Sequence, residues 1–152
     1  MRYLISMLPL LVLTGCDPGY GIYRSARVPF MPPTALVGTV VKETAGFDEV
    51  DYKASEGGRP LTVTGIKSPD QVHTFSYRSG SNVNGSLQFV VDYKGRVEYS
   101  QSLMMLGRRP PQEWIDATRP LMLQIEGGLE RRCGLTNLSA SVHETCHGVK
   151  CK

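Results

Sequence analysis

The sequence predicts an α+β domain in which an antiparallel sheet of about four to five strands carries an N-terminal helix and C-terminal helices on one face. Three observations lead to this fold class. Apolar residues recur at helical spacing after Thr34, short runs rich in Val, Thr, Tyr and Phe fill the middle of the chain, and helical spacing returns after Glu113. Because the predicted strands are consecutive and the helices lie at the two ends, we expect helices segregated to one side of the sheet.

The first predicted helix begins at Thr34, a residue type that caps helix N-termini, and ends near Gly46. Its apolar stripe consists of Val37, Val40, Val41 and Thr44. These positions fall at i, i+3, i+4 and i+7, as in an amphipathic helix. Because the segment is rich in β-branched residues, a strand is the alternative.

Five runs with strand composition follow, at residues 47–54, 60–66, 72–78, 87–93 and 96–103. Lys94-Gly95 lies between the last two runs, and a glycine in the second turn position favours a short hairpin there. Residues 79–86 contain Asn84-Gly85 and are predicted to form a longer loop with a turn.

The main C-terminal helix has a stripe made of Trp114, Ile115, Thr118, Leu121, Met122, Ile125 and Leu129. Pro120 interrupts this pattern, so we expect a kink or a break between two helices. Between Leu135 and Val149 apolar residues again recur near helical spacing, which favours a last helix over a strand.

The N-terminus has the three parts of a secretory signal: Arg2, an apolar run over residues 3–13, and small residues before Cys16. Leu13-Thr14-Gly15-Cys16 resembles the lipobox of bacterial lipoproteins. The resemblance covers residues 1–17 and implies that residues 1–15 are a signal peptide and that Cys16 carries a covalent diacylglycerol and an N-acyl chain. An ordinary secretory signal followed by an incidental cysteine is the alternative.

The lipoprotein resemblance also predicts a location. It implies a lipid-anchored protein of the bacterial envelope that faces the periplasm, and Asp17 resembles the signal for retention in the inner membrane rather than the outer one. Residues 16–33 are rich in proline and lack periodicity, so we expect a lipidated, extended tether followed by one domain over residues 34–152.

The net charge narrows the classes of partner. Removal of Arg2 with the signal peptide leaves 16 basic and 14 acidic residues, a net charge of +2 with no basic stripe, and this argues against nucleic acid.

Lipidation of Cys16 leaves three cysteines in an oxidising compartment. We expect a disulfide between Cys146 and Cys151, with Cys133 as the alternative partner of either.

Residues that could carry chemistry are few. His143, Cys146, His147 and Cys151 would supply metal ligands if they lay on a helix, but their spacing matches no standard zinc site. Glu49 and Asp51 share one strand face, where a glycosidase pair or a solvated surface would both fit. We predict no catalytic residues, no metal, no cofactor beyond the lipid and no small-molecule substrate.

The segment most suggestive of a partner contains Arg108, Arg109 and Trp114, since Arg and Trp are frequent interface anchors. Placement of Trp114 in the core is the alternative. The sequence therefore predicts a non-catalytic protein-binding module that contacts an envelope or secreted protein. An immunity or inhibitor protein against a toxic effector is one form of it, and an accessory subunit of an envelope assembly machine is another. A small metal-binding or enzymatic envelope protein is the competing class.

Overall fold

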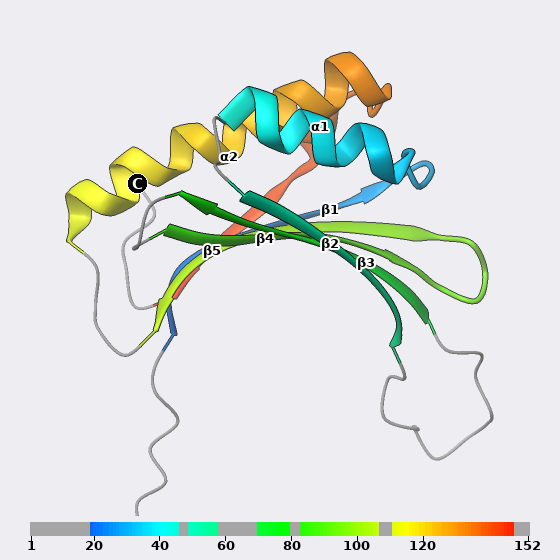
Figure 1. The fold of residues 1–152 in the computed structure, drawn as a ribbon, viewed down its shortest axis with the longest axis horizontal. Helices are drawn as coiled ribbons and strands as arrows, with labels where there is room; N and C mark the ends of the chain where they lie inside the picture. Colours follow the sequence, from blue (N-terminus) through cyan, green and yellow to red (C-terminus); the bar gives the residue numbers. More distant parts are fainter. Residues whose placement is uncertain (1–18, 46–48, 58–69, 80–82, 107–110, 148–152) are drawn as a thin grey trace, which may run out of the picture.

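A computed structural model of the chain describes residues 19–45, 49–57, 70–79, 83–106 and 111–147. They form an antiparallel sheet of six strands, in the order β2-β3-β4-β5-β1-β6. The long helices α1 and α2 lie together on one side of it (Figure 1). The strands are β1 (Gly19–Val28), β2 (Glu49–Gly57), β3 (Asp70–Ser79), β4 (Val83–Val91), β5 (Val97–Leu106) and β6 (His143–His147). The helices are α1 (Thr34–Ala45), α2 (Gln112–Cys133) and α3 (Leu138–Ser141).

The α+β class and the antiparallel sheet are confirmed, and the sheet has more strands than the four to five predicted. Strands β2, β3, β4 and β5 overlap predicted runs, whereas the run at 60–66 lies outside the described residues. The hairpin after β4 is also confirmed, because Gly95 has a φ of 75° and the Asp92 amide donates to the Arg96 carbonyl at 2.9 Å.

The first helix follows its prediction closely. α1 begins at Thr34, and the carbonyl of Pro33 accepts hydrogen bonds from the amides of Leu36 and Val37. Val37, Val40 and Val41 are fully buried. The β-branched stripe therefore packs on the sheet as a helix, since the burial of one helical face outweighs a weak intrinsic preference.

Helix α2 continues through Pro120 as one element of 22 residues. The break allowed for at this proline does not occur. Pro120 itself is exposed, while Thr118 and Met122 beside it are buried. Packing of the apolar stripe holds the helix together across the missing amide donor. The helix ends before Gly134, whose φ of 72° is the left-handed conformation that favours glycine.

The expectation of a tether over residues 16–33 is wrong for its central part. Gly19–Val28 forms β1, which pairs with β5 over its whole length and with β6 on the other side. Ile22, Arg24 and Val28 alternate with exposed residues and point into the covered side of the sheet. The strand pattern was hidden because an arginine stands at one of the buried positions.

The predicted last helix is also mostly wrong. Between Leu135 and His147, where the described residues end, only the four residues of α3 are helical, and His143–His147 forms β6 as an edge strand beside β1. The turn expected at Asn84-Gly85 does not form either, because β4 already begins at Val83. Gly85 lies directly opposite Tyr77, and a Cβ there would come within 1.9 Å of the Tyr77 ring.

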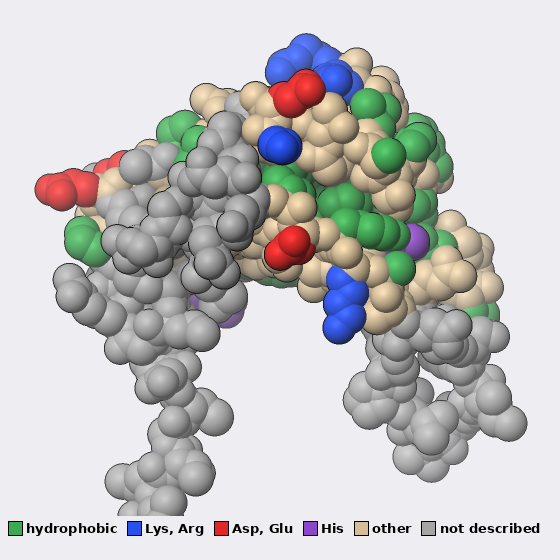
Figure 2. All heavy atoms as spheres, in the orientation of Figure 1, with side chains coloured by type: hydrophobic (Ala, Val, Ile, Leu, Met, Phe, Trp, Pro, Cys, Tyr) green, Lys and Arg blue, Asp and Glu red, His purple; other side chains and the backbone are tan. Residues whose placement is uncertain are grey.

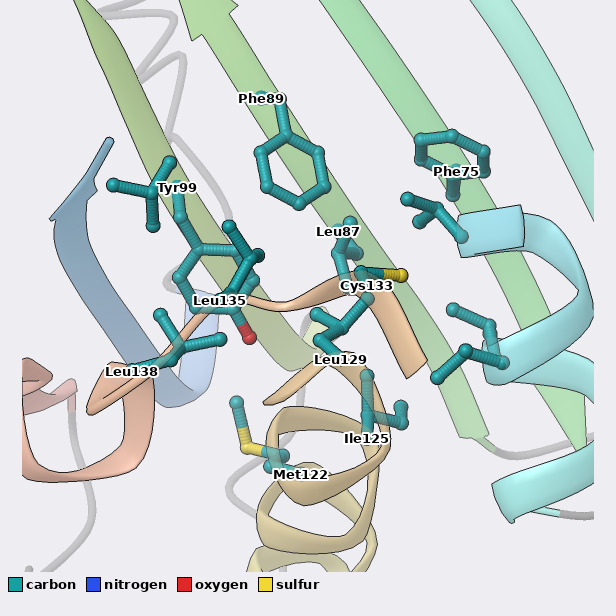
Figure 3. Close-up of a cluster of buried hydrophobic side chains, with 14 of the residues drawn as sticks. Phe75, Leu87, Phe89, Tyr99, Met122, Ile125, Leu129, Cys133, Leu135 and Leu138 are labelled. Carbon is teal, nitrogen blue, oxygen red and sulfur yellow. The ribbon is translucent and has the colours of Figure 1, made fainter. Parts of the chain in front are cut away.

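The core fills the space between the sheet and the two long helices. Figure 3 shows Phe75, Leu87 and Phe89 of the sheet facing Met122, Ile125 and Leu129 of α2. All six side chains are fully buried. No helix of the described ranges is long and apolar enough to cross a membrane.

Candidate functional site

The sheet is arched, and the helices lie on its convex side (Figure 1). We call the opposite side the concave face. The strand registers align its side chains in two rows that cross all six strands. One row consists of Lys53, Thr74, Gln88, Ser100, Ser25 and His143. The other consists of Asp51, Ser76, Ser86, Ser102, Tyr23 and Thr145.

None of the side chains in these two rows is buried. Hydroxyl and amide groups fill the middle of the rows, Asp51 and Lys53 lie on the edge strand β2, and His143 lies on the other edge strand, β6. Tyr23 lies near the β6 side with 39% of its surface exposed. With neighbouring strands about 4.8 Å apart, six strands give a surface about 24 Å wide. This is a broad, nearly neutral surface with an exposed aromatic ring, a side-chain type that is enriched in protein interfaces.

The covered side of the sheet contains a buried charge network, formed by Arg24, Glu126, Glu144 and Arg119. Arg24 Nε and Nη2 donate to the two carboxylate oxygens of Glu126 at 2.7 and 2.9 Å. Arg24 Nη1 donates to Glu144, and Arg119 Nη2 donates to the other Glu144 oxygen at 2.8 Å. The network thus joins β1, α2 and β6.

Polar side chains of the sheet extend this network toward β3. The Tyr99 hydroxyl donates to Gln101 at 2.7 Å, and the Gln101 amide donates to the Tyr77 hydroxyl at 3.0 Å. Burial raises the pKa of both tyrosines, and the negative charge of Glu126 adds to the effect. Both phenols therefore stay protonated and act as neutral members of the network.

The charge interactions within the network favour the ionised form of Arg24. Burial on its own would lower the pKa of Arg24, but its hydrogen bonds and charge attraction to Glu126 and Glu144 raise that pKa overall. Arg24 is 7% exposed and Glu126 is 0% exposed. These two groups are thus almost closed to solvent and already bonded to each other, so we assign the network to holding the fold and not to binding a ligand.

The structure describes only part of the predicted partner-binding segment. Arg108 and Arg109 lie outside the described residues, as do Cys16 and Asp17. Trp114 lies in the first turn of α2, and its side chain is not among those described. That Arg108, Arg109 and Trp114 bind a partner stays a prediction.

The cysteines and histidines of the C-terminal segment do not converge. His143 and His147 lie on the concave face of β6, about 13 Å apart along an extended strand, and Cys146 points to the opposite face. The helical neighbourhood of His143 and His147 is therefore not formed, and the fourth candidate ligand, Cys151, lies outside the described residues, so the metal alternative stays a hypothesis. Cys133 is a buried free thiol and Cys146 is not free. Pairing of Cys133 is therefore not the arrangement found, and the Cys146–Cys151 bridge stays a prediction because Cys151 lies outside the described residues.

The structure describes only one side chain of the acidic pair of β2. Asp51 is exposed on the edge strand, and the side chain of Glu49 is not among those described. His73 points to the helix side of the sheet, where its Nδ1 lies 2.9 Å from the Tyr52 hydroxyl. These placements favour the solvated-surface interpretation of the acidic run.

The buried charge network was missed at the sequence level, although a signal for it exists. Glu126 lies four residues after Met122 and three before Leu129, which places it beside the apolar stripe of α2. Arg24 lies at an inward position of β1 between Ile22 and Ala26. A charged residue at an inward position on each of two elements predicts a buried pair.

Comparisons with known proteins add no assignment: no family model, no curated protein and no solved structure matches this chain.

Proposed function

We propose that this protein is a lipid-anchored protein of the bacterial envelope whose domain binds another protein through the concave face. The observation that carries the proposal is the pair of polar rows that crosses all six strands without a buried residue. Small-molecule sites are enclosed and mostly apolar, whereas this face is wide and open and holds an exposed tyrosine, a residue type that is enriched in protein interfaces.

Within this class we favour an immunity or inhibitor protein that neutralises an envelope-targeting effector. The supporting argument is rigidity, because the charge network fixes β1 and β6 to α2 underneath the concave face. Inhibitor complexes typically form from interfaces that barely move on binding. An accessory subunit of an envelope assembly machine would use the same surface without the requirement for rigidity.

Site-specific photo-crosslinking in intact cells tests the binding face. A photoreactive residue at Tyr23 should form a defined adduct with a protein, whereas one at Leu123, which is 43% exposed on α2, should not. Ser100→Arg places a large cation in the middle of one polar row and should abolish the adduct. The matched control Gln124→Arg on the exposed side of α2 should leave it unchanged. Equal crosslinking from Tyr23 and Leu123 would refute the concave face as the binding surface.

If the partner is a toxic effector, its expression in the periplasm should arrest growth unless this protein is present. Ser100→Arg should then lose protection while the protein remains folded and abundant, and Gln124→Arg should protect like the wild type. Full protection by Ser100→Arg would contradict the inhibitor assignment.

A further inference from the structure

Strand β2 forms one edge of the sheet, and its outer side pairs with no other strand of the described part of the chain. All five residues from Asp51 to Ser55 are exposed. An edge strand carries a row of backbone donors and acceptors that another strand can use. Charged side chains normally discourage this pairing, and β2 has Asp51 and Lys53 on the concave face.

The sequence of β2 is complementary to itself. In an antiparallel pair of two β2 strands centred on Tyr52, Asp51 of each copy lies directly opposite Lys53 of the other. Val50 then lies opposite Ala54. Directly opposed side chains on one face are the closest neighbours across a strand pair, and opposite charges there are stabilising. Asp51 and Lys53 disfavour pairing of β2 with most other strands. They favour pairing with β2 of a second copy of this chain.

The register is specific because the two neighbouring registers are unfavourable. A two-fold axis perpendicular to the sheet keeps the helices of both copies on one side, so the pairing shifts in steps of two residues. A shift in one direction places Asp51 opposite Asp51, and a shift in the other places Lys53 opposite Lys53. Like charges directly opposed are destabilising. The register centred on Asp51 also places Lys53 opposite Glu49, but of these three registers only the one centred on Tyr52 pairs opposite charges without opposing like ones.

The helix side of the same edge offers an aromatic contact. Tyr52 is 48% exposed, and its ring lies 4.9 Å from that of Phe75 and is stacked on His73 with planes 10° apart. Its hydroxyl contacts His73 Nδ1, so the ring is held against the sheet. Figure 2 shows hydrophobic side chains gathered on this side of the molecule, between α1 and the sheet edge. In the proposed pair, the two Tyr52 residues lie opposite each other on the helix side, with each ring held against β3 of its own copy.

We propose that two copies of this chain associate edge to edge through β2, in the antiparallel register centred on Tyr52, to give one continuous sheet. The inference goes beyond the proposed function and does not depend on the identity of the partner. One strand pair is a small interface, so we expect micromolar to millimolar affinity in solution. Attachment of both copies to one membrane surface would raise their effective concentration.

Charge reversal tests the register. The experiment is sedimentation equilibrium on the full chain with Cys16→Ser, at concentrations up to the millimolar range. Asp51→Lys and Lys53→Asp should each weaken dimerisation at least fivefold, because each creates two like-charge pairs. The double variant Asp51→Lys/Lys53→Asp should restore it to within twofold of the parent. Asp116→Lys and Lys94→Asp change the net charge by the same amounts at exposed sites away from β2 and should have no effect.

A second measurement examines the lipidated protein in membranes. Tyr52→Cys should give a covalent dimer under mild oxidation, whereas Lys94→Cys should not. A parent chain that stays monomeric at every concentration, or a double variant that fails to restore association, would overturn the proposal. Circular dichroism of each variant establishes that it is folded. Equal crosslinking of Tyr52→Cys and Lys94→Cys would show random collision and also count against it.

Discussion

Arg24 and Glu126 lie 102 residues apart in the chain and form a two-pronged, almost completely buried ion pair. A paired charge in the interior stabilises the fold little relative to apolar residues, but a single unpaired one is strongly unfavourable. A misaligned β1 would leave both charges buried without a partner, so the pair favours the correct alignment of β1 beneath α2.

Removal of one partner should be costly. Glu126→Leu leaves the Arg24 guanidinium in the core without its main acceptor, and we expect a loss of about 3–5 kcal/mol of stability in urea unfolding. The double variant Arg24→Met/Glu126→Leu should lose less than Glu126→Leu alone, because no buried charge is left unbalanced. Glu43→Gln, which breaks an exposed pair with Arg132, should stay within about 1 kcal/mol of the wild type. A Glu126→Leu variant as stable as Glu43→Gln would contradict this account.

Glu144 should control the attachment of β6. Its carboxylate accepts from Arg24 on β1 and from Arg119 on α2, and β6 is a short edge strand with only one neighbouring strand in the described sheet. Glu144→Gln weakens both charged contacts. In hydrogen exchange, the β6 amides should become less protected, while those of β3 and β4 keep their rates. Unchanged protection of β6 would show that backbone pairing alone holds the strand.

Gly85 should be intolerant of even a methyl group. An added Cβ would lie 1.9 Å from Cε2 of Tyr77, a ring that is 2% exposed and cannot move aside freely. We expect Gly85→Ala to destabilise the protein by about 1–3 kcal/mol in thermal or urea unfolding. Tyr77→Leu removes the obstructing ring, so Gly85→Ala should cost much less in that background. Equal losses in the two backgrounds would mean that the Tyr77 ring is not the obstacle.

Cys133 should be protected from alkylation in the native state. Burial raises the pKa of its thiol, which keeps the unreactive neutral form at neutral pH. The stabilisation from burying the neutral thiol is present below its unfolded pKa and is lost as the pH rises through the raised folded value. Iodoacetamide should therefore react slowly in buffer at pH 7 and rapidly in urea.

The same reagent counts thiols. In the unreduced Cys16→Ser chain in urea, the predicted Cys146–Cys151 bridge leaves one reactive thiol, and reduction should raise the number to three. Three reactive thiols before reduction would refute the bridge.

The sequence predicts those parts of the fold in which local preference and burial agree. In α1 the valine stripe and its burial against the sheet both favour one helix, and in β3, β4 and β5 composition and burial both favour strands. β1 was missed because Arg24 occupies an inward position that only a partner 102 residues away makes favourable. β6 was missed because its pairing with β1 is a long-range contact that periodicity does not register.

The candidate binding surface could not be predicted for the same reason. Ser25, Ser100 and Thr145 are unremarkable in the sequence, and they form a common surface only once β5, β1 and β6 are neighbours. In the sequence, only single residues that are frequent interface anchors, such as Arg108 and Trp114, indicate a contact with a partner. A surface built from small polar side chains requires the strand order before it can be recognised.

The early start of β1 changes what the protein can reach. The proposed lipid on Cys16 and the first strand residue, Gly19, are three residues apart. Three residues span at most about 10 Å, whereas a free spacer of 18 residues would extend to about 60 Å. If Cys16 carries the proposed lipid, the first strand begins within about 10 Å of the anchor, and a partner of the domain would have to bind close to the bilayer surface.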